Sequence, residues 1–160
     1  MKYLFISVIT LSLLSLGCSK KETKAEPEAK LSIEPSGYYW LNLMPPVPAD
    51  GPSFHAIFRV KVTNVGKGIA RNVKAISADI YLIADDEESK FGRMELRPSP
   101  STSIENDLLP GEEMTIEFGG SIPGATRVTP GLTVYGNVFL VWDSGHSIVS
   151  TPADQVMATR

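Results

Sequence analysis

The feature that most restricts the possible folds of this chain is the alternation of apolar and polar residues in SFHAIFRVKVTN, residues 53–64. Every second position from Phe54 to Val62 is apolar, and the positions between them are polar or charged, with Ile57 as the exception. Successive side chains of a β-strand point to opposite faces, so this pattern predicts a strand with one buried face and one wet face. The following residues, NVGKG, tolerate the backbone angles of a turn.

A second strand is predicted within residues 69–86, where the alternation is strongest at Ile76, Ala78, Ile80 and Leu82. Val73 lies in the opposite phase, which predicts a bulge or kink between Val73 and Ile76. The downstream segments are interpreted as a polar loop, a short edge strand and an irregular stretch rich in proline and serine, at residues 85–92, 91–97 and 97–107.

Residues 108–118 begin with a Pro-Gly turn and continue as a strand with Met114, Ile116 and Phe118 on one face. Residues 131–150 are interpreted as a hairpin that turns at Asp-Ser-Gly, residues 143–145. No stretch sustains a helical period, and glycine and proline are spaced through the chain. Short strands joined by turns over about 130 residues predict one all-β domain, an antiparallel β-sandwich spanning residues 31–160.

The amino terminus is typical of an exported protein. Lys2 precedes an uncharged run, residues 3–16, that is too short to cross a bilayer comfortably, so residues 1–17 are predicted to be a signal peptide. LSLGC, residues 14–18, resembles the lipobox of bacterial lipoproteins, although Ser15 stands where that family usually has leucine. The resemblance implies cleavage before Cys18, a diacylglycerol on its sulfur and an acylated amine, which together anchor the protein to a membrane. The alternative is an ordinary secretory signal with an incidental cysteine.

The same resemblance bears on location. In enterobacterial lipoproteins an aspartate after the cysteine favours retention in the inner membrane, and this chain has Ser19. The resemblance therefore implies a lipid-anchored protein of the cell envelope, at the outer membrane where the host has one. Cys18 is the only cysteine in the chain, so no internal disulfide is expected.

Residues 18–30 are predicted to be a lipidated end followed by a disordered tether. Lysines alternate with glutamates there, Pro27 interrupts any helix, and too little apolar surface is present to offset the entropy of ordering. We interpret the segment as a spacer. Contact of its lysines with anionic headgroups is the alternative, which the interleaved glutamates disfavour.

Residues 62–80 and 108–118 resemble the bacterial immunoglobulin-like domains of the CARDB type. That family has a strand ending in an Asn-x-Gly turn, an Ala-x-Asn-Val strand and a Pro-Gly-Glu turn before a further strand, and the hairpin at residues 131–150 takes the place of its last two strands. The resemblance covers residues 54–150 and implies an immunoglobulin-like sandwich serving as an extracytoplasmic adhesion or assembly module, with no catalytic residues. The segment before Phe54 departs from that family's short first strand.

No recognisable catalytic motif occurs in the sequence. His55 and His146 are far apart and lack a third ligand, so no metal site is predicted. The four consecutive acids at residues 85–88 splay outward in an extended chain and are interpreted as a solvated loop. We therefore predict no enzyme activity and no cofactor, with an enzyme built from scattered acids and His146 as a minor alternative. The formal net charge of −3 and the absence of a basic stripe argue against nucleic acid as a partner.

Tyr38, Tyr39 and Trp40 are the candidate contacts for a ligand or partner. Three adjacent aromatics in a strand cannot all face one side, so at least one is expected outside the core. Exposed Tyr and Trp are favoured at protein interfaces and on surfaces that stack against sugars. The leading hypothesis is a non-catalytic lipoprotein that binds or assembles with another envelope protein. The alternative is a carbohydrate-binding module that uses the same aromatics on a polysaccharide. A purely structural role of the aromatics at the end of the sandwich remains open.

Overall fold

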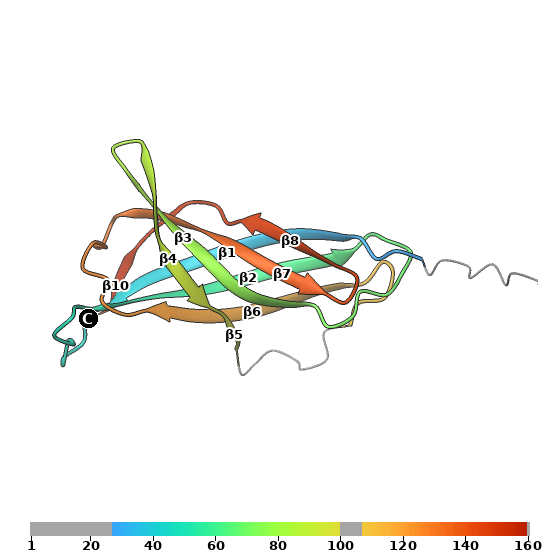
Figure 1. Ribbon diagram of the computed structural model, residues 1–160, viewed down its shortest axis with the longest axis horizontal. Coiled ribbons are helices and arrows are strands. Elements are labelled where there is room, and N and C mark those ends of the chain that lie inside the picture. Colours follow the sequence, from blue (N-terminus) through green and yellow to red (C-terminus); the bar gives the residue numbers. More distant parts are fainter. Residues whose placement is uncertain (1–26, 100–106, 160) are drawn as a thin grey trace, which may run out of the picture.

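The computed structural model describes residues 27–99 and 107–159, and these ranges contain β-strands and no helix. The strands form two sheets packed face to face in an elongated body (Figure 1). The all-β prediction is confirmed. The predicted signal peptide, Cys18 and the tether up to residue 26 lie outside the described residues. The strands are β1 (Leu31–Asn42), β2 (Ser53–Asn64), β3 (Lys74–Ala84), β4 (Glu87–Glu95), β5 (Arg97–Pro98), β6 (Glu113–Ile122), β7 (Thr133–Trp142), β8 (Gly145–Ser150), β9 (Asp154–Gln155) and β10 (Met157–Thr159).

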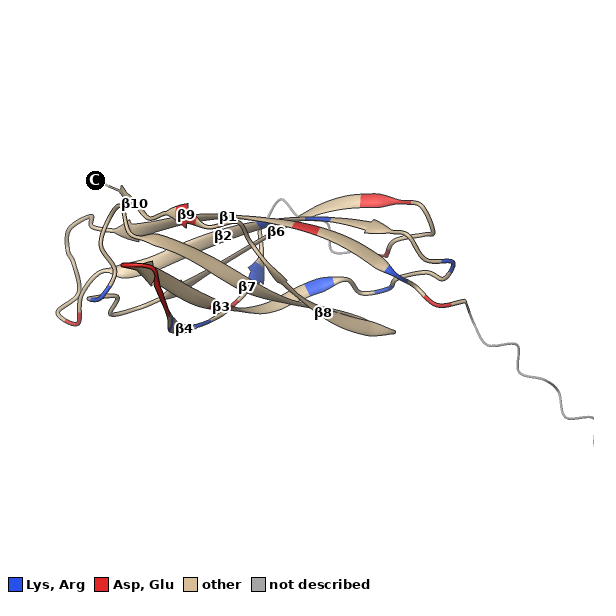
Figure 2. Cartoon of the chain, turned by 90° about the horizontal axis from the view of Figure 1, so that it is seen from above, with Lys and Arg blue, Asp and Glu red and all other residues tan. Residues whose placement is uncertain are grey.

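The strand order is that of an immunoglobulin-like sandwich. The first sheet has the order β10-β1-β2-β6-β5 and the second the order β4-β3-β7-β8, with β9 also paired to β7. Leaving β9 and β10 aside, these are the ABED sheet and the CFG sheet of an immunoglobulin domain, with one further strand on the second sheet. The two layers are seen edge-on in Figure 2. After β9 the chain crosses to the first sheet, where β10 pairs in parallel with β1, so the last residues join the two sheets at one edge.

The core lies between the sheets and is built by the predicted alternation. All five apolar residues at alternate positions of β2, from Phe54 to Val62, are completely buried. Ile116 and Phe118 of β6 lie beside them on the same face of the first sheet. Val134, Val138 and Leu140 of β7 are also buried, on one face of that strand. Each large apolar side chain buried in this way contributes about 1.5–3 kcal/mol.

Strand β3 contains a bulge close to the predicted position. The pairing of β3 with β7 shifts between Ala75 and Ser77, so Ile76 is the extra residue. Ile76 faces outward and is 37% exposed. Its assignment to the buried face is therefore wrong, because an inserted residue shifts the alternation by one position.

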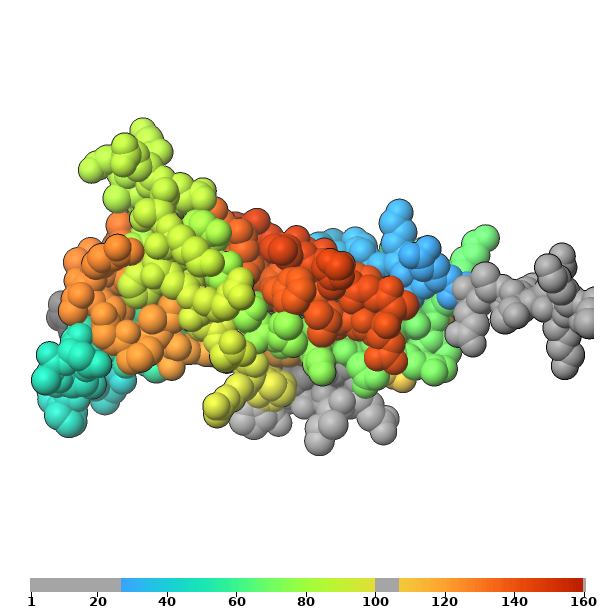
Figure 3. Space-filling model, in the orientation of Figure 1, coloured from blue at the N-terminus to red at the C-terminus, as the bar shows by residue number. Residues whose placement is uncertain are grey.

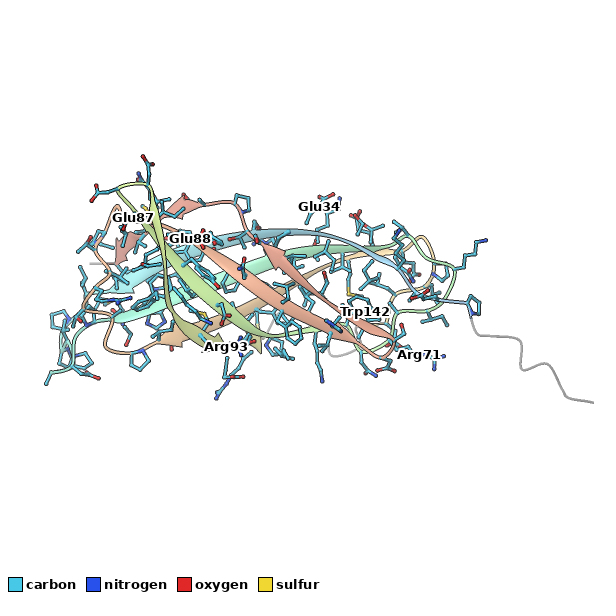
Figure 4. All side chains as sticks on the ribbon, turned by 45° about the horizontal axis from the view of Figure 1, so that its top comes forward. Glu34, Arg71, Glu87, Glu88, Arg93 and Trp142 are labelled. Atoms are coloured by element: carbon cyan, nitrogen blue, oxygen red, sulfur yellow. The ribbon has the colours of Figure 1, made fainter. Side chains whose placement is uncertain are left out.

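The polar loop predicted at residues 85–92 is also wrong. Only Asp85 and Asp86 form the turn, with left-handed φ angles of 50° and 63°, which aspartate tolerates better than most residues. β4 begins at Glu87, and its charged residues lie on an edge strand, where charge discourages pairing with other chains. Figure 4 shows Glu87 and Glu88 on this projecting hairpin. The stretch after β4 is less irregular than expected, since Arg97 and Pro98 pair with β6.

The last residues of the predicted tether are part of the ordered domain. Ala29 is only 6% exposed, and the carbonyl oxygens of Glu28 and Lys30 accept hydrogen bonds from backbone N–H groups of the β2–β3 loop. A Cβ on Gly68 would overlap the carbonyl of Pro27, so the glycine-rich turn makes this close approach possible. Composition alone does not reveal this contact, because it depends on the shape of the turn.

We call the end of the sandwich at which the described chain begins the tether end, and the opposite end the far end. The tether end carries the β2–β3 loop, the β7–β8 turn and the turn before β6. The far end carries the β1–β2 loop and the carboxyl terminus (Figure 1).

Candidate functional site

Strand β1 separates the three candidate aromatics between the two faces of the first sheet. Tyr39 is completely buried, whereas Tyr38 is 50% exposed and Trp40 is half-buried on the outer face. The expectation that at least one of the three lies outside the core is confirmed, because successive residues of a strand face opposite sides.

Tyr39 is a core residue that ties the two sheets together. Its hydroxyl lies 2.6 Å from the Oγ1 of Thr151, which also accepts a hydrogen bond from the backbone N–H of Gly136 at 3.0 Å. Its ring stacks on Phe54 and meets Phe58 edge-on. Burial raises the pKa of Tyr39 to about 12. A side chain so enclosed presents no surface to a partner, so the candidate contacts reduce to Tyr38 and Trp40.

The two outward aromatics and His55 form what we call the aromatic platform. Trp40 and His55 are directly paired in the β1–β2 register, and their rings stack with centroids 5.2 Å apart at an angle of 13°. The centroid of Tyr38 lies 5.5 Å from that of Trp40 at 32°. Burial lowers the pKa of His55 below its ordinary value of 6.5, which favours the neutral imidazole near neutral pH. The platform is thus a row of three uncharged rings on a sheet face.

Apolar side chains extend the platform toward the far end. Met157 of β10 is paired with Trp40 and is 52% exposed. The β1–β2 loop adds exposed Leu43, Met44 and Val47. Aromatic residues and methionine are enriched at protein interfaces, so this composition suits contact with another macromolecule.

Sequence reasoning missed the part that His55 plays, since it interpreted this residue as an isolated strand histidine. No local signal identifies the contact, because it depends on the register in which β1 pairs with β2. Only the pairing of the two strands shows that Trp40 lies opposite His55.

A second surface that the sequence analysis did not single out lies on the outer face of the second sheet. A groove of about 490 Å³ there is lined by both apolar and polar side chains. The apolar ones include Ile76, Phe139 and Ile148, and Ile148 is 65% exposed. Figure 3 looks onto this sheet, with β4 and the β7–β8 hairpin on the near side. The sequence signal for this surface is that β7 has apolar residues on both of its faces, with Tyr135 and Phe139 on the outer one.

Two carboxylates line this groove, Asp79 and Glu95, and Asp79 is paired with two cations. The Arg93 Nε and the Lys90 Nζ donate to it at 2.7 and 2.8 Å. The hydrogen bond from Arg93, with that from Lys90, lowers the pKa of Asp79 to about 2. A carboxylate held ionised by two partners is a poor proton acceptor, so Asp79 is poorly suited to act as a general base.

The described part of the chain does not bring together the ligands of a metal site. Among residues 27–99 and 107–159, no three His, Cys, Asp or Glu side chains gather so that they could hold a metal ion. His55 lies on the first sheet and His146 on the second. A groove of about 650 Å³ at the tether end contains His146 with a single acidic residue, Glu28, in its lining. In the same ranges, no helix has the length and apolar character needed to cross a membrane.

Comparison with known proteins leaves the family open. No family model matches the sequence, and no curated protein matches it significantly. A protein of Bordetella pertussis designated ApaA is 16% identical, with a TM-score of 0.37, over 84% of this chain and 98% of that one. The structural genomics target SoR45 is 14% identical, with a TM-score of 0.39, over 81% of this chain and 86% of that one. The sporulation control protein Spo0M of Bacillus subtilis is 17% identical, with a TM-score of 0.37, and the match covers 79% of this chain but only 50% of Spo0M.

Proposed function

We propose that this protein is an envelope lipoprotein, anchored through an acylated Cys18, whose immunoglobulin-like sandwich is a non-catalytic module that binds another envelope protein. The observation that carries the proposal is the aromatic platform, with its apolar extension toward the far end. That end lies opposite the one at which the tether joins the domain. By the lipoprotein resemblance, Ser19 favours the outer membrane in a host that has one.

The dimensions support display of the platform away from a membrane. Cys18 precedes Pro27 by nine residues, which span at most about 30 Å when fully extended. Strand β1 has 12 residues and is therefore about 40 Å long at roughly 3.3 Å per residue. A domain standing on its tether end thus carries Tyr38 and Trp40 tens of ångströms from the anchor.

The construction of the platform supports binding to a protein. Trp40 is backed by the stacked ring of His55 and flanked by Tyr38, so its orientation is set before a partner arrives. A pre-ordered aromatic side chain loses little conformational entropy on binding, and Trp and Tyr are the residues that most often dominate the energy of an interface.

The test is crosslinking in intact cells, followed by isolation of the lipoprotein and identification of its neighbours. The variants Trp40→Ala and Tyr38→Ala are compared with Ile148→Ala, which removes a more exposed apolar side chain from the other sheet. We expect a loss of about 30-fold in affinity for a partner anchored on Trp40, corresponding to about 2 kcal/mol. An unchanged set of crosslinked neighbours in the Trp40→Ala and Tyr38→Ala variants would show that the platform does not bind the partner protein.

The anchor is tested separately by metabolic labelling with palmitate. Label is expected in the wild-type protein and absent from Cys18→Ala. An unlabelled wild-type protein from its native host would refute the lipoprotein assignment, whatever the platform binds.

A second candidate function is carbohydrate binding, favoured by the geometry of the exposed rings. Tyr38 and Trp40 lie side by side on a sheet face with centroids 5.5 Å apart, so both can stack against one extended glycan. Retention on immobilised cell-wall polysaccharide that disappears in Trp40→Ala would support this function. Retention that survives this substitution would exclude the platform as the sugar site.

A further inference from the structure

Three exposed apolar side chains lie on neighbouring loops at the tether end. Val65 and Ile69 belong to the β2–β3 loop and are 56% and 41% exposed, and Leu109 lies in the turn before β6 and is 49% exposed. The two segments are adjacent because Ala70 and Leu108 form an isolated β-bridge between them. The side chains therefore occur together at one end of the molecule.

A buried asparagine holds these loops in a fixed shape. Asn64 is completely buried, and its Nδ2 donates to the carbonyl oxygens of Gly68 at 2.7 Å and Leu108 at 2.9 Å. Its Oδ1 accepts a hydrogen bond from the backbone N–H of Gly66 at 3.0 Å. One side chain thus connects both loops, and the apolar residues they carry are presented without a further ordering cost.

The charges at this end are arranged so that cations face outward. Lys30, Lys67 and Arg71 make no ion pair with any residue in the part of the chain that the structure describes. Figure 4 shows Arg71 at this end of the ribbon. These side chains can meet the phosphates of lipid headgroups.

Most acidic side chains at this end are engaged with the protein. Asp107 and Asp143 accept hydrogen bonds from Asn72, at 3.0 and 2.8 Å. Glu112 accepts one from the backbone N–H of Leu109 at 2.9 Å. Each of these carboxylates keeps its negative charge, because its donor is neutral. Together with Glu28 they are at least as numerous as the three outward cations, so the tether end carries no excess of positive charge.

From the apolar loops and the position of the tether we infer that the tether end is a membrane-contacting surface, in which Val65, Ile69 and Leu109 enter the headgroup region of a bilayer. Lys30, Lys67 and Arg71 would meet the lipid phosphates around them. The inference rests on the proposed lipid anchor, because a tether of at most about 30 Å brings this end of the domain to the bilayer. Contact there fixes the orientation of the sandwich and holds the aromatic platform away from the membrane.

The experiment uses the acylated full chain reconstituted in vesicles made of equal parts phosphatidylglycerol and phosphatidylcholine. Since acylation blocks Cys18, a cysteine introduced elsewhere is the only free thiol and takes an environment-sensitive dye. The dye is placed by Val65→Cys or Leu109→Cys, and by Ile148→Cys as a control at a somewhat more exposed apolar position on the second sheet. Quenching by a nitroxide attached to the lipid headgroup reports contact with the bilayer.

We expect quenching at positions 65 and 109 to exceed that at position 148 about threefold, because interfacial side chains lie within 5–10 Å of the headgroups. Replacing the anionic lipid by phosphatidylcholine should leave this difference in place, because the apolar side chains and not an excess of cations make the contact. Equal quenching at all three positions would overturn the inference. Protection of positions 65 and 109 from aqueous iodide without vesicles, increasing with protein concentration, would also overturn it, by identifying a second copy as the occupant.

A protein that is not acylated gives a result different from that of an acylated protein whose tether end does not contact the bilayer. A protein that is not acylated carries a reactive thiol at Cys18, which takes up dye in the chain without an introduced cysteine, and its intact mass lacks the acyl chains. The two failures are therefore distinguished in the same preparation.

Discussion

The substitution Tyr39→Phe tests whether one buried hydroxyl links the two sheets. It removes a single oxygen, which lies 2.6 Å from the Oγ1 of Thr151, and leaves the ring contacts with Phe54 and Phe58 in place. Tyr39 is completely buried and Thr151 is 5% exposed, so water does not replace the lost partner. Thr151 still accepts from the N–H of Gly136, but the bond between the two hydroxyls is lost.

The expected loss of stability is about 1–2 kcal/mol, the value of a hydrogen bond whose remaining partner stays buried. In urea unfolding, with a slope of roughly 1–3 kcal/mol per molar, this lowers the midpoint by about 0.5–1 M. Thr151→Val is expected to cost a similar amount, and the double variant less than the sum, by about 1 kcal/mol, because both partners are then apolar. Tyr38→Phe, at a half-exposed position on the same strand, is the matched control and should leave the midpoint unchanged.

Two results would refute the reasoning. A midpoint of Tyr39→Phe equal to that of Tyr38→Phe would show that the bond adds nothing to stability. Strict additivity of Tyr39→Phe and Thr151→Val would show that the two hydroxyls do not interact, whatever each contributes alone.

Three further predictions concern pH and packing. Because burial raises the pKa of Tyr39 from 10.0 to about 12, its contribution to stability is complete below pH 10 and is lost as the pH rises toward 12, so Tyr39→Phe should flatten the alkaline part of a plot of unfolding free energy against pH. Asp79 behaves oppositely: the hydrogen bond from Arg93 lowers its pKa from 3.8 to about 2, so its contribution is present above pH 4 and is lost between pH 4 and 2, and Asp79→Asn should show a shallower acid slope in thermal melts. Gly136→Ala should destabilise the fold by about 1–3 kcal/mol in urea unfolding, since a Cβ there would lie 2.6 Å from the ring of Phe58; a wild-type midpoint would contradict this packing.

Several parts of the fold could be predicted from the sequence because they depend on local alternation. The buried face of β2 and the β7–β8 hairpin lie where apolar residues recur at every second position, and a strand has only two faces to offer. The same rule required one of the three adjacent aromatics to leave the core. The class of fold could be predicted as well, because no segment has apolar residues at the spacing of a helix.

Other features depend on residues that are distant in sequence. The bulge at Ile76 reverses the phase of the strand before it, and the extension of β4 through Glu87 depends on pairing with β3, which compensates for an unfavourable local composition. The docking of residues 27–30 depends on the space left by Gly66 and Gly68.

The sequence by itself determined the class of fold, the pattern of strand faces and the separation of Tyr39 from its two neighbours, because these follow from the period of a strand. Only the tertiary structure decided that His55 lies under Trp40, that Thr151 meets Tyr39 across the core and that Asn64 joins two loops at the tether end. Each of these contacts depends on strand register and sheet packing, which are properties of paired segments and not of any one stretch of chain.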